Sequence, residues 1–217
     1  MDIKRTIWGA FAYVYEHRRP FAKALSIPVF MLVLFGVLVV EVTNSVVLIL
    51  LVIVPWYIYT LLAITTHRII LLGPGSVSEW GIYVPRKREF DFFFYTIALS
   101  IMMIPFGFLS LIPTIGWIIT LLVIIYMMAR LSLIFPAIAT DQRWSFSDSW
   151  KATENHQVLM MVVVAILPFV ISIPEQLLSN LPYAGLFVNL LSAFTMVFVV
   201  AALSVAFQVI TERSGAT

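Results

Sequence analysis

Arg130 stands inside a long apolar stretch of this sequence, YMMARLSLIFP at residues 126–136. Farther along, the stretch RWSFSDSWKATENHQ carries hydroxyl groups at Ser149 and Thr153, followed by His156. Helical residues three or four apart lie on one face, so these polar groups are expected to share a face. A guanidinium next to a hydroxyl-bearing face is chemistry that suits a phosphate group.

Arg130 has two interpretations, in which the guanidinium either binds a lipid phosphate or reaches the inner membrane surface. As a lipid site, Arg130 and Tyr126, with Ser149, Thr153 and His156 nearby, would hold the phosphate of an anionic phospholipid. As an anchor, Arg130 would extend to the inner membrane surface while local backbone groups satisfy the hydroxyls. Counted from Gly116 at the outer surface, at about 1.5 Å per residue, the Cα of Arg130 lies about 21 Å into a hydrocarbon core about 30 Å thick. This depth is compatible with both interpretations.

A capping box is also expected in this region. Ser145 and Asp148 have the spacing at which the first side chain accepts from a backbone N–H and the second reaches back. This pair predicts that a short helix begins after Ser145 and carries the hydroxyl-bearing face.

Other chemistry is poorly represented in the sequence. There is no cysteine, and the three histidines share no spacing typical of a metal site. Motifs of zinc proteases, serine hydrolases and phosphate-binding loops are missing, and GPGS at residues 73–76 is interpreted as a turn. No carboxylate lies in the middle of an apolar segment, which disfavours an ion-coupled carrier. We therefore expect no catalytic residue, metal or cofactor, and a protein that is not an enzyme.

The composition indicates a membrane protein. Of 217 residues, 62% are hydrophobic and 11% are charged, and the mean hydropathy is +1.04. Soluble domains are about 45–50% apolar and about 25% charged. The net charge of +2 is too small to indicate a nucleic-acid partner. The whole chain, residues 1–217, is predicted to be one transmembrane domain.

The sequence has six apolar segments, of which the first and fifth are short for a span and are extended by flanking residues. Backbone groups in hydrocarbon must be paired within a helix. The expected fold class is therefore all-α, a polytopic bundle of six transmembrane helices preceded by an amphipathic interfacial helix at residues 1–23. The predicted spans are 24–40, 46–66, 92–112, 117–139, 157–174 and 184–210.

The basic residues predict the orientation. With six spans, all 13 lysines and arginines lie on the side of the N-terminus, whereas Glu41 and Glu175 lie on the other side. Cytoplasmic loops are enriched in lysine and arginine, so both termini are expected in the cytoplasm. The expected location is the inner membrane of a bacterial cell.

The N-terminal segment repeats apolar residues at helical spacing, at Ile3, Ile7, Ala10, Phe11 and Val14. Such a helix lies in the membrane interface with its apolar face in the acyl region. It either senses anionic lipid or covers the inner face of the bundle, and the sequence leaves both open.

Small and polar residues recur along the third and sixth spans. Ser100 and Gly107 belong to one such stripe, and Gly185, Asn189 and Ala193 belong to the other. In lipid, small residues let helix backbones approach closely, so these positions are predicted to be helix contacts. Asn189 has a second interpretation as a ligand group.

RLSLIFP followed by SFSDSWKAT, with HRIILLG and REFDFFFY, resembles a family of poorly characterised bacterial six-span proteins. These are the YciC-like proteins and the membrane domain attached to some glycerophosphodiester phosphodiesterases. The resemblance covers residues 60–165 and matches Arg130, Pro136, Ser149 and Thr153. It implies an all-helical inner-membrane protein and no established reaction.

Two classes of function remain. The first is a non-catalytic membrane module that binds anionic phospholipid or a membrane-protein partner in envelope organisation or complex assembly. The second is a small oligomeric transporter or lipid-translocating component. A polar cavity between the third and sixth spans would favour transport, and a dry seam there would favour the module. A homo-oligomer is compatible with both.

Overall fold

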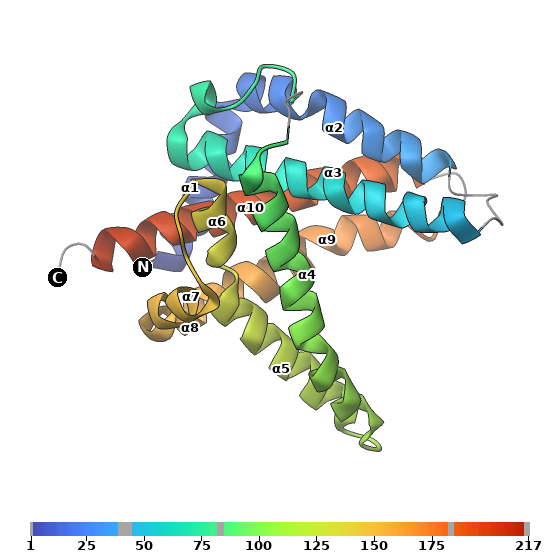
Figure 1. The fold of residues 1–217 in the computed structure, drawn as a ribbon, viewed down its shortest axis with the longest axis vertical. Helices are drawn as coiled ribbons and strands as arrows, with labels where there is room; N and C mark the ends of the chain where they lie inside the picture. The colour runs from blue at the N-terminus through green and yellow to red at the C-terminus, as the bar shows by residue number, and fades with distance from the viewer. Residues whose placement is uncertain (1, 39–44, 82–84, 182–184, 215–217) are drawn as a thin grey trace.

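A computed structural model describes residues 2–38, 45–81, 85–181 and 185–214. Within these ranges every regular element is helical (Figure 1). The longer helices are α1 (Asp2–Glu16), α2 (Arg18–Leu38), α3 (Ser45–Leu72), α4 (Lys87–Gly107), α5 (Gly116–Leu131), α9 (Leu167–Leu178) and α10 (Gly185–Ser214). Shorter elements are η2 (Pro74–Ser76), η3 (Phe108–Leu111), α6 (Ile134–Ala139), α7 (Phe146–Ala152), η4 (Glu154–His156), α8 (Gln157–Met161) and the π-helical η5 (Val162–Ile166).

The all-helical fold class is confirmed, and four helices of the described chain are long and apolar enough to cross a membrane. They correspond to the third to sixth predicted spans: Lys87–Leu111, Gly116–Ala139, Glu154–Leu178 and Gly185–Arg213. The second predicted span lies in α3, and the first lies in α2 except for residues 39 and 40, which are outside the described ranges.

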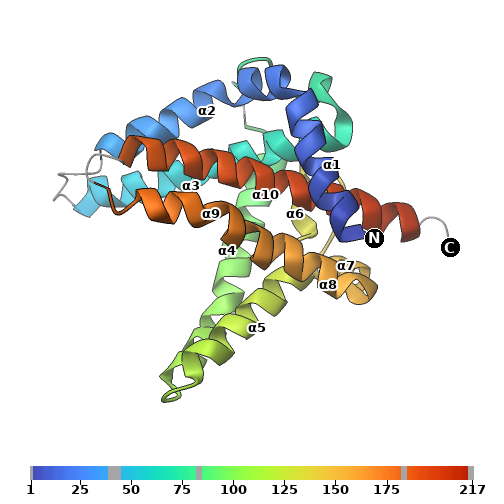
Figure 2. The ribbon, with the colours of Figure 1, turned by 180° about the vertical axis from the view of Figure 1, so that it is seen from behind.

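The helices form two arms that diverge from a common end (Figures 1 and 2). In one arm α2, α3, α9 and α10 run beside one another, and α10 packs against the other three. In the other arm α4 and α5 form a hairpin that projects away from that group. The short elements α6, α7 and α8 lie at the common end, where α6 contacts both α3 and α4.

α1 packs along the C-terminal half of α10 (Figure 2). Thr6 and Ala10 are buried against it, and Gly9 lies close to Val205. Arg5 pairs with Glu212 at 3.4 Å, and Arg213 pairs with Asp2 at 2.7 Å. The helix therefore covers the bundle, as one interpretation predicted, while Trp8, Phe11 and Tyr15 stay exposed.

The segment after α3 folds back onto α2. Lys23 of α2 pairs with Glu79 at 2.6 Å and lies over the ring of Trp80. Gly81 has a φ of 67°, and a Cβ at this position would lie 2.2 Å from the carbonyl oxygen of Ala24. Only glycine permits this close approach, so it holds the loop in place beside α2.

Two prolines explain why the fourth and fifth spans are interrupted. Pro136 has no N–H and its ring excludes the carbonyl four residues earlier, that of Ser132, where α5 gives way to α6. Pro168 follows the π-helical η5, in which the N–H of Leu167 bonds the carbonyl of Val162. Such a bulge accommodates the missing backbone bond.

Candidate functional site

Arg130 is buried, with 3% of its surface exposed, at the end of α5. Its guanidinium carbon lies 4.4 Å from the ring centroid of Trp150 in α7. The rings of Tyr126 and Trp150 form a T-shaped pair, with their centroids 5.9 Å apart. Among the described residues Arg130 has no acidic partner, and its Nε and Nη1 atoms are buried without a hydrogen bond. The arginine is therefore held by an aromatic ring instead of a counter-charge.

The two hydroxyls predicted beside Arg130 bind its backbone. Ser149 Oγ donates to the carbonyl oxygen of Arg130 at 2.9 Å, and Thr153 Oγ1 lies 3.2 Å from the same oxygen. Thr153 Oγ1 is also 2.9 Å from the carbonyl oxygen of Ser149, so Ser149 is the main donor. This carbonyl lies in the last turn of α5, where the proline break leaves acceptors without helical donors. The hydroxyls dock α7 onto the end of α5.

The predicted capping box of α7 is confirmed. Ser145 Oγ accepts from the N–H of Asp148 at 3.3 Å, and Asp148 Oδ2 accepts from the N–H of Ser145 at 2.8 Å. The hydrogen bonds from Ser145, more than the neighbouring charge of Lys151, hold the pKa of Asp148 below its ordinary value. His156, by contrast, lies beyond α7 and lines a different cavity with Asp2 and Ile3 of α1.

These contacts change the interpretation of Arg130. A lipid ligand and an interfacial anchor both require a guanidinium that reaches lipid or water, and this one lies under Trp150. A cation over an aromatic face gains about 2 kcal/mol when water is excluded. The geometry thus assigns Arg130 a role in joining α5 to α7.

The predicted packing residues fall into two groups. Ala193 is buried between helices, and Asn189 is half-buried. Gly107 and Gly185 are exposed, and a Cβ added at either would meet no atom of the described residues within 4 Å. Ser100 is also exposed, and its hydroxyl bonds the carbonyl of Thr96. The predicted contacts of both glycines are therefore corrected for the described residues, because Gly107 ends α4 and Gly185 begins α10, and no described neighbour lies against the Cβ position of either glycine.

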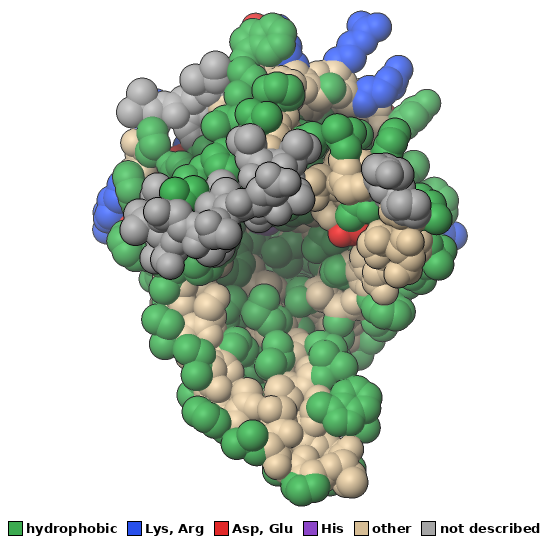
Figure 3. Space-filling view, turned by 90° about the vertical axis from the view of Figure 1, so that its right-hand side faces the viewer, with side chains coloured by type: hydrophobic (Ala, Val, Ile, Leu, Met, Phe, Trp, Pro, Cys, Tyr) green, Lys and Arg blue, Asp and Glu red, His purple; other side chains and the backbone are tan. Residues whose placement is uncertain are grey.

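A cavity of about 480 Å³ occupies the junction of the two arms, and Figure 3 looks into the hollow between them. Its walls come from α3, α4, α5, α6 and α10 and are mostly apolar. The polar lining residues are His67, Thr96 and Ser100, and the His67 Nδ1 lies 2.8 Å from Ser204 Oγ. This hollow separates the third and sixth predicted spans, and its apolar walls resemble the dry seam more than a polar pathway.

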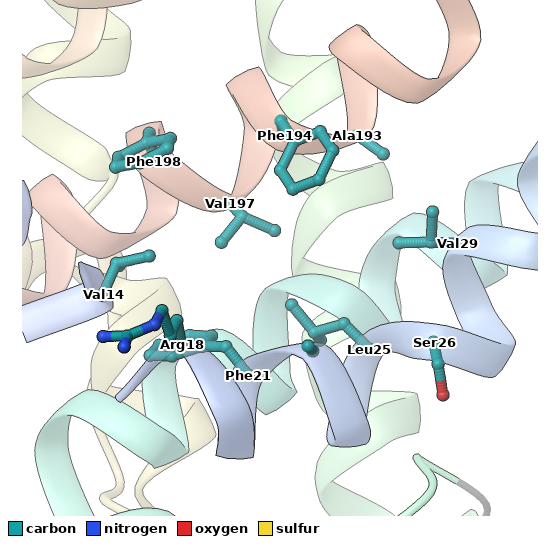
Figure 4. A pocket seen from close by; sticks show the side chains of 11 residues that line it. Val14, Arg18, Phe21, Leu25, Ser26, Val29, Ala193, Phe194, Val197 and Phe198 are labelled. Atoms are coloured by element: carbon teal, nitrogen blue, oxygen red, sulfur yellow. The ribbon is translucent and has the colours of Figure 1, made fainter. Parts of the chain in front are cut away.

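A second apolar cavity, of about 350 Å³, lies between α2 and α10 next to the end of α1 (Figure 4). We call it the Arg18 cavity, because Arg18 is the charged residue in its lining. The other lining residues are Val14, Phe21, Ala22, Leu25, Ser26, Val29, Ala193, Phe194, Val197 and Phe198. From the sequence, Arg18 is expected on the cytoplasmic side with the other basic residues, and no site is predicted there. The available signal was two arginines directly before an apolar helix, which is common in membrane proteins.

A network of ion pairs joins the start of α4 to the segment after α6. Glu89 is fully buried and accepts from Nε and Nη2 of Arg88 at 2.9 and 2.6 Å and from the N–H of Arg86 at 2.7 Å. Asp141 accepts from Arg68 at 2.8 Å and from Arg88 at 3.4 Å. Arg68 also donates to the carbonyl oxygen of Ala139. The pairs fix the common end of the two arms.

No protein-family model, curated protein or solved structure matches this chain. The resemblance to YciC-like proteins stays a prediction.

Proposed function

We propose that this protein is a non-catalytic membrane module that binds an anionic phospholipid in the Arg18 cavity. The observation that carries the proposal is an apolar cavity between α2 and α10 with one arginine in its lining (Figure 4). An acyl chain would lie against the apolar residues, and the lipid phosphate would bind the guanidinium of Arg18.

Arg18 is available for such a contact. Its side chain is exposed, donates to the carbonyl oxygen of Tyr15 at 3.1 Å and lies over the Tyr15 ring at 5.0 Å. Within the described ranges it forms no ion pair with a carboxylate. Arg18 also begins α2, and the N-terminal end of a helix attracts negative charge.

The dimensions fit one lipid chain. Arg18 and Val29, at opposite ends of the lining along α2, are separated by about 16 Å at 1.5 Å per residue. This is about half of a hydrocarbon core about 30 Å thick, the depth of one leaflet. A helix about 10 Å across would fit only about one turn into 350 Å³, so a narrow chain suits this cavity better.

We further propose that the chain lies in a bacterial inner membrane with six spans and both termini in the cytoplasm, because the basic residues then share one side. Reporter fusions after Arg19, Arg86, Arg143 and Arg213 should give cytoplasmic signals. Fusions near Asn44 and Asn180 should give periplasmic signals. A periplasmic signal after Arg86 would exclude six spans in this orientation.

Native mass spectrometry with phosphatidylglycerol and phosphatidylcholine tests the lipid site. Arg18→Gln should reduce retention of phosphatidylglycerol about tenfold, since a charge-assisted hydrogen bond is lost. Ala22→Trp should reduce retention of both lipids by filling the cavity. The matched controls are Arg19→Gln, an exposed arginine outside the lining, and Ala12→Trp, an exposed alanine on α1.

Equal retention by Arg18→Gln and Arg19→Gln would reject Arg18 as the phosphate contact. Movement of lipid between leaflets by the purified protein in vesicles would instead favour the lipid-translocating alternative. The apolar walls of the hollow between the arms favour the module over a carrier of polar substrates.

A further inference from the structure

We propose that a small cavity at the start of α4 is a separate binding site for a phosphate group. The cavity holds about 170 Å³ and lies between the end of α3, the η2 segment and the residues around Arg86. We call it the arginine cavity, and its lining residues are Thr65, Arg68, Ser76, Val77, Ser78, Arg86 and Arg88.

The charges that face this cavity favour an anion. Arg68, Arg86 and Arg88 contribute to its walls, and no carboxylate is among the described lining residues. Asp141 and Glu89, which pair with Arg68 and Arg88, lie outside that lining. Arg86 forms no ion pair with any described residue, and the Arg86 side chain is exposed.

Hydrogen-bond donors remain available at the same place. Among the described residues, the bonds of Arg68 engage Nε and Nη1, so its Nη2 is left for another acceptor. Ser78 Oγ is buried and has no partner among the described residues. A buried hydroxyl without a partner is unfavourable, and an anion oxygen would accept its hydrogen. The arginines and this serine therefore offer several donors around one cavity, as a phosphate requires.

The size and the neighbouring cavity narrow the ligand class. Pockets for drug-sized ligands hold about 300–1,000 Å³, so 170 Å³ suits a single phosphate group. A larger cavity of about 470 Å³, which shares Arg88, has mixed charges in its lining, with Asp91 and Asp141 beside Lys87, Arg88 and Arg143. In the smaller cavity every charged residue of the described lining is an arginine. The selectivity for phosphate thus belongs to the smaller cavity.

The phosphate can come from a lipid headgroup or from free phosphate, and two arms of one experiment separate these sources. Isothermal titration calorimetry of the full chain in detergent measures binding of inorganic phosphate. Native mass spectrometry measures retention of phosphatidic acid relative to phosphatidylcholine. Arg86→Gln should weaken binding about tenfold in the arm that reports the true source, because one charge-assisted contact is removed.

The controls make the result specific to this cavity. Lys87→Gln removes an exposed neighbouring charge outside the lining and should leave binding unchanged. Ser78→Ala should weaken binding without changing net charge. Equal binding by wild type, Arg86→Gln and Ser78→Ala in both arms overturns the proposal, as does an equal loss in Lys87→Gln. The site does not rest on the Arg18 cavity, and Arg18→Gln should leave it intact.

Discussion

Arg130 and Arg88 lie near the common end of the two arms, and their largely buried guanidinium groups are stabilised in different ways. Arg88 has a side chain 11% exposed and bonds the buried carboxylate of Glu89 at 2.6 Å. Arg130 has 3% of its surface exposed, rests over Trp150 and has no carboxylate among the described residues. One charge is neutralised by an ion pair, and the other is stabilised by a ring.

The difference determines what each arginine needs from its surroundings. Removing one member of a buried ion pair leaves an uncompensated charge and is strongly destabilising. An arginine stacked on an aromatic ring leaves no opposite charge behind when it is replaced by an apolar residue. We therefore expect the Glu89–Arg88 pair to be intolerant of single substitutions and the Arg130–Trp150 pair to tolerate apolar replacement.

The largest effect is expected for Glu89→Ala. This change leaves Arg88 without its main partner and the N–H of Arg86 without an acceptor, so it should lower the free energy of unfolding by about 3–5 kcal/mol. Denaturant unfolding in detergent measures the loss. Asp91→Ala, two residues later on α4 and without an ion pair in the described part of the chain, is the control. Equal losses in the two variants would contradict the assigned role of Glu89.

A smaller effect is expected for Arg130→Lys. Lysine keeps the charge but loses the planar group that stacks on Trp150, so the free energy of unfolding should fall by about 1–2 kcal/mol. Arg130→Leu should be tolerated better than Glu89→Ala, since it removes the buried charge entirely. In a Trp150→Leu background the lysine effect should disappear, and its persistence would show that the ring does not hold the guanidinium.

The hydroxyls that bind the Arg130 carbonyl come next. Ser149→Ala should lower the free energy of unfolding by about 1 kcal/mol, and Thr153→Val should lower it by less because its hydroxyl is shared. The double variant should exceed the sum of the single ones, as it leaves the carbonyl without either donor. Ser147→Ala, an exposed position on α7, is the control. Strict additivity would indicate that the hydroxyls do not share one acceptor.

The smallest effect is expected for Ser145→Ala in the exposed capping box. The pKa of Asp148 is lowered in the folded state, so its stabilisation is present above about pH 4 and is lost as pH falls through the lowered pKa. Thermal unfolding is measured at several pH values. The melting temperature of the wild type should exceed that of Ser145→Ala at pH 7, and the two melting temperatures should converge at acid pH. A pH-independent difference would assign the effect to the serine cap alone.

The sequence predicted local features well where the responsible residues are close in the chain. The capping box at Ser145 and Asp148 spans three residues, and its geometry follows from spacing alone. The hydroxyl pair was correctly placed next to Arg130. Its acceptor was missed, because a backbone carbonyl in another helix has no signature in the sequence.

The packing predictions show the limit of such reasoning. Ala193 and Gly185 belong to the same small-residue stripe, yet Ala193 is buried and Gly185 is exposed. Helix faces in lipid are apolar whether or not they meet another helix, so composition does not reveal where two helices diverge. Here Gly185 begins α10, whereas Ala193 lies about two turns farther along, where α2 runs beside α10 (Figures 1 and 2).

By itself, the sequence determined that this chain is helical and suited to a membrane, because hydropathy and backbone pairing act along each segment. The tertiary structure alone decided that Trp150 covers Arg130 and that α10 completes the Arg18 cavity. It also decided that Arg68 and Arg86 line the same arginine cavity. These arrangements join residues far apart in the chain. Their energies depend on which surfaces meet, and that choice is made only when the helices pack.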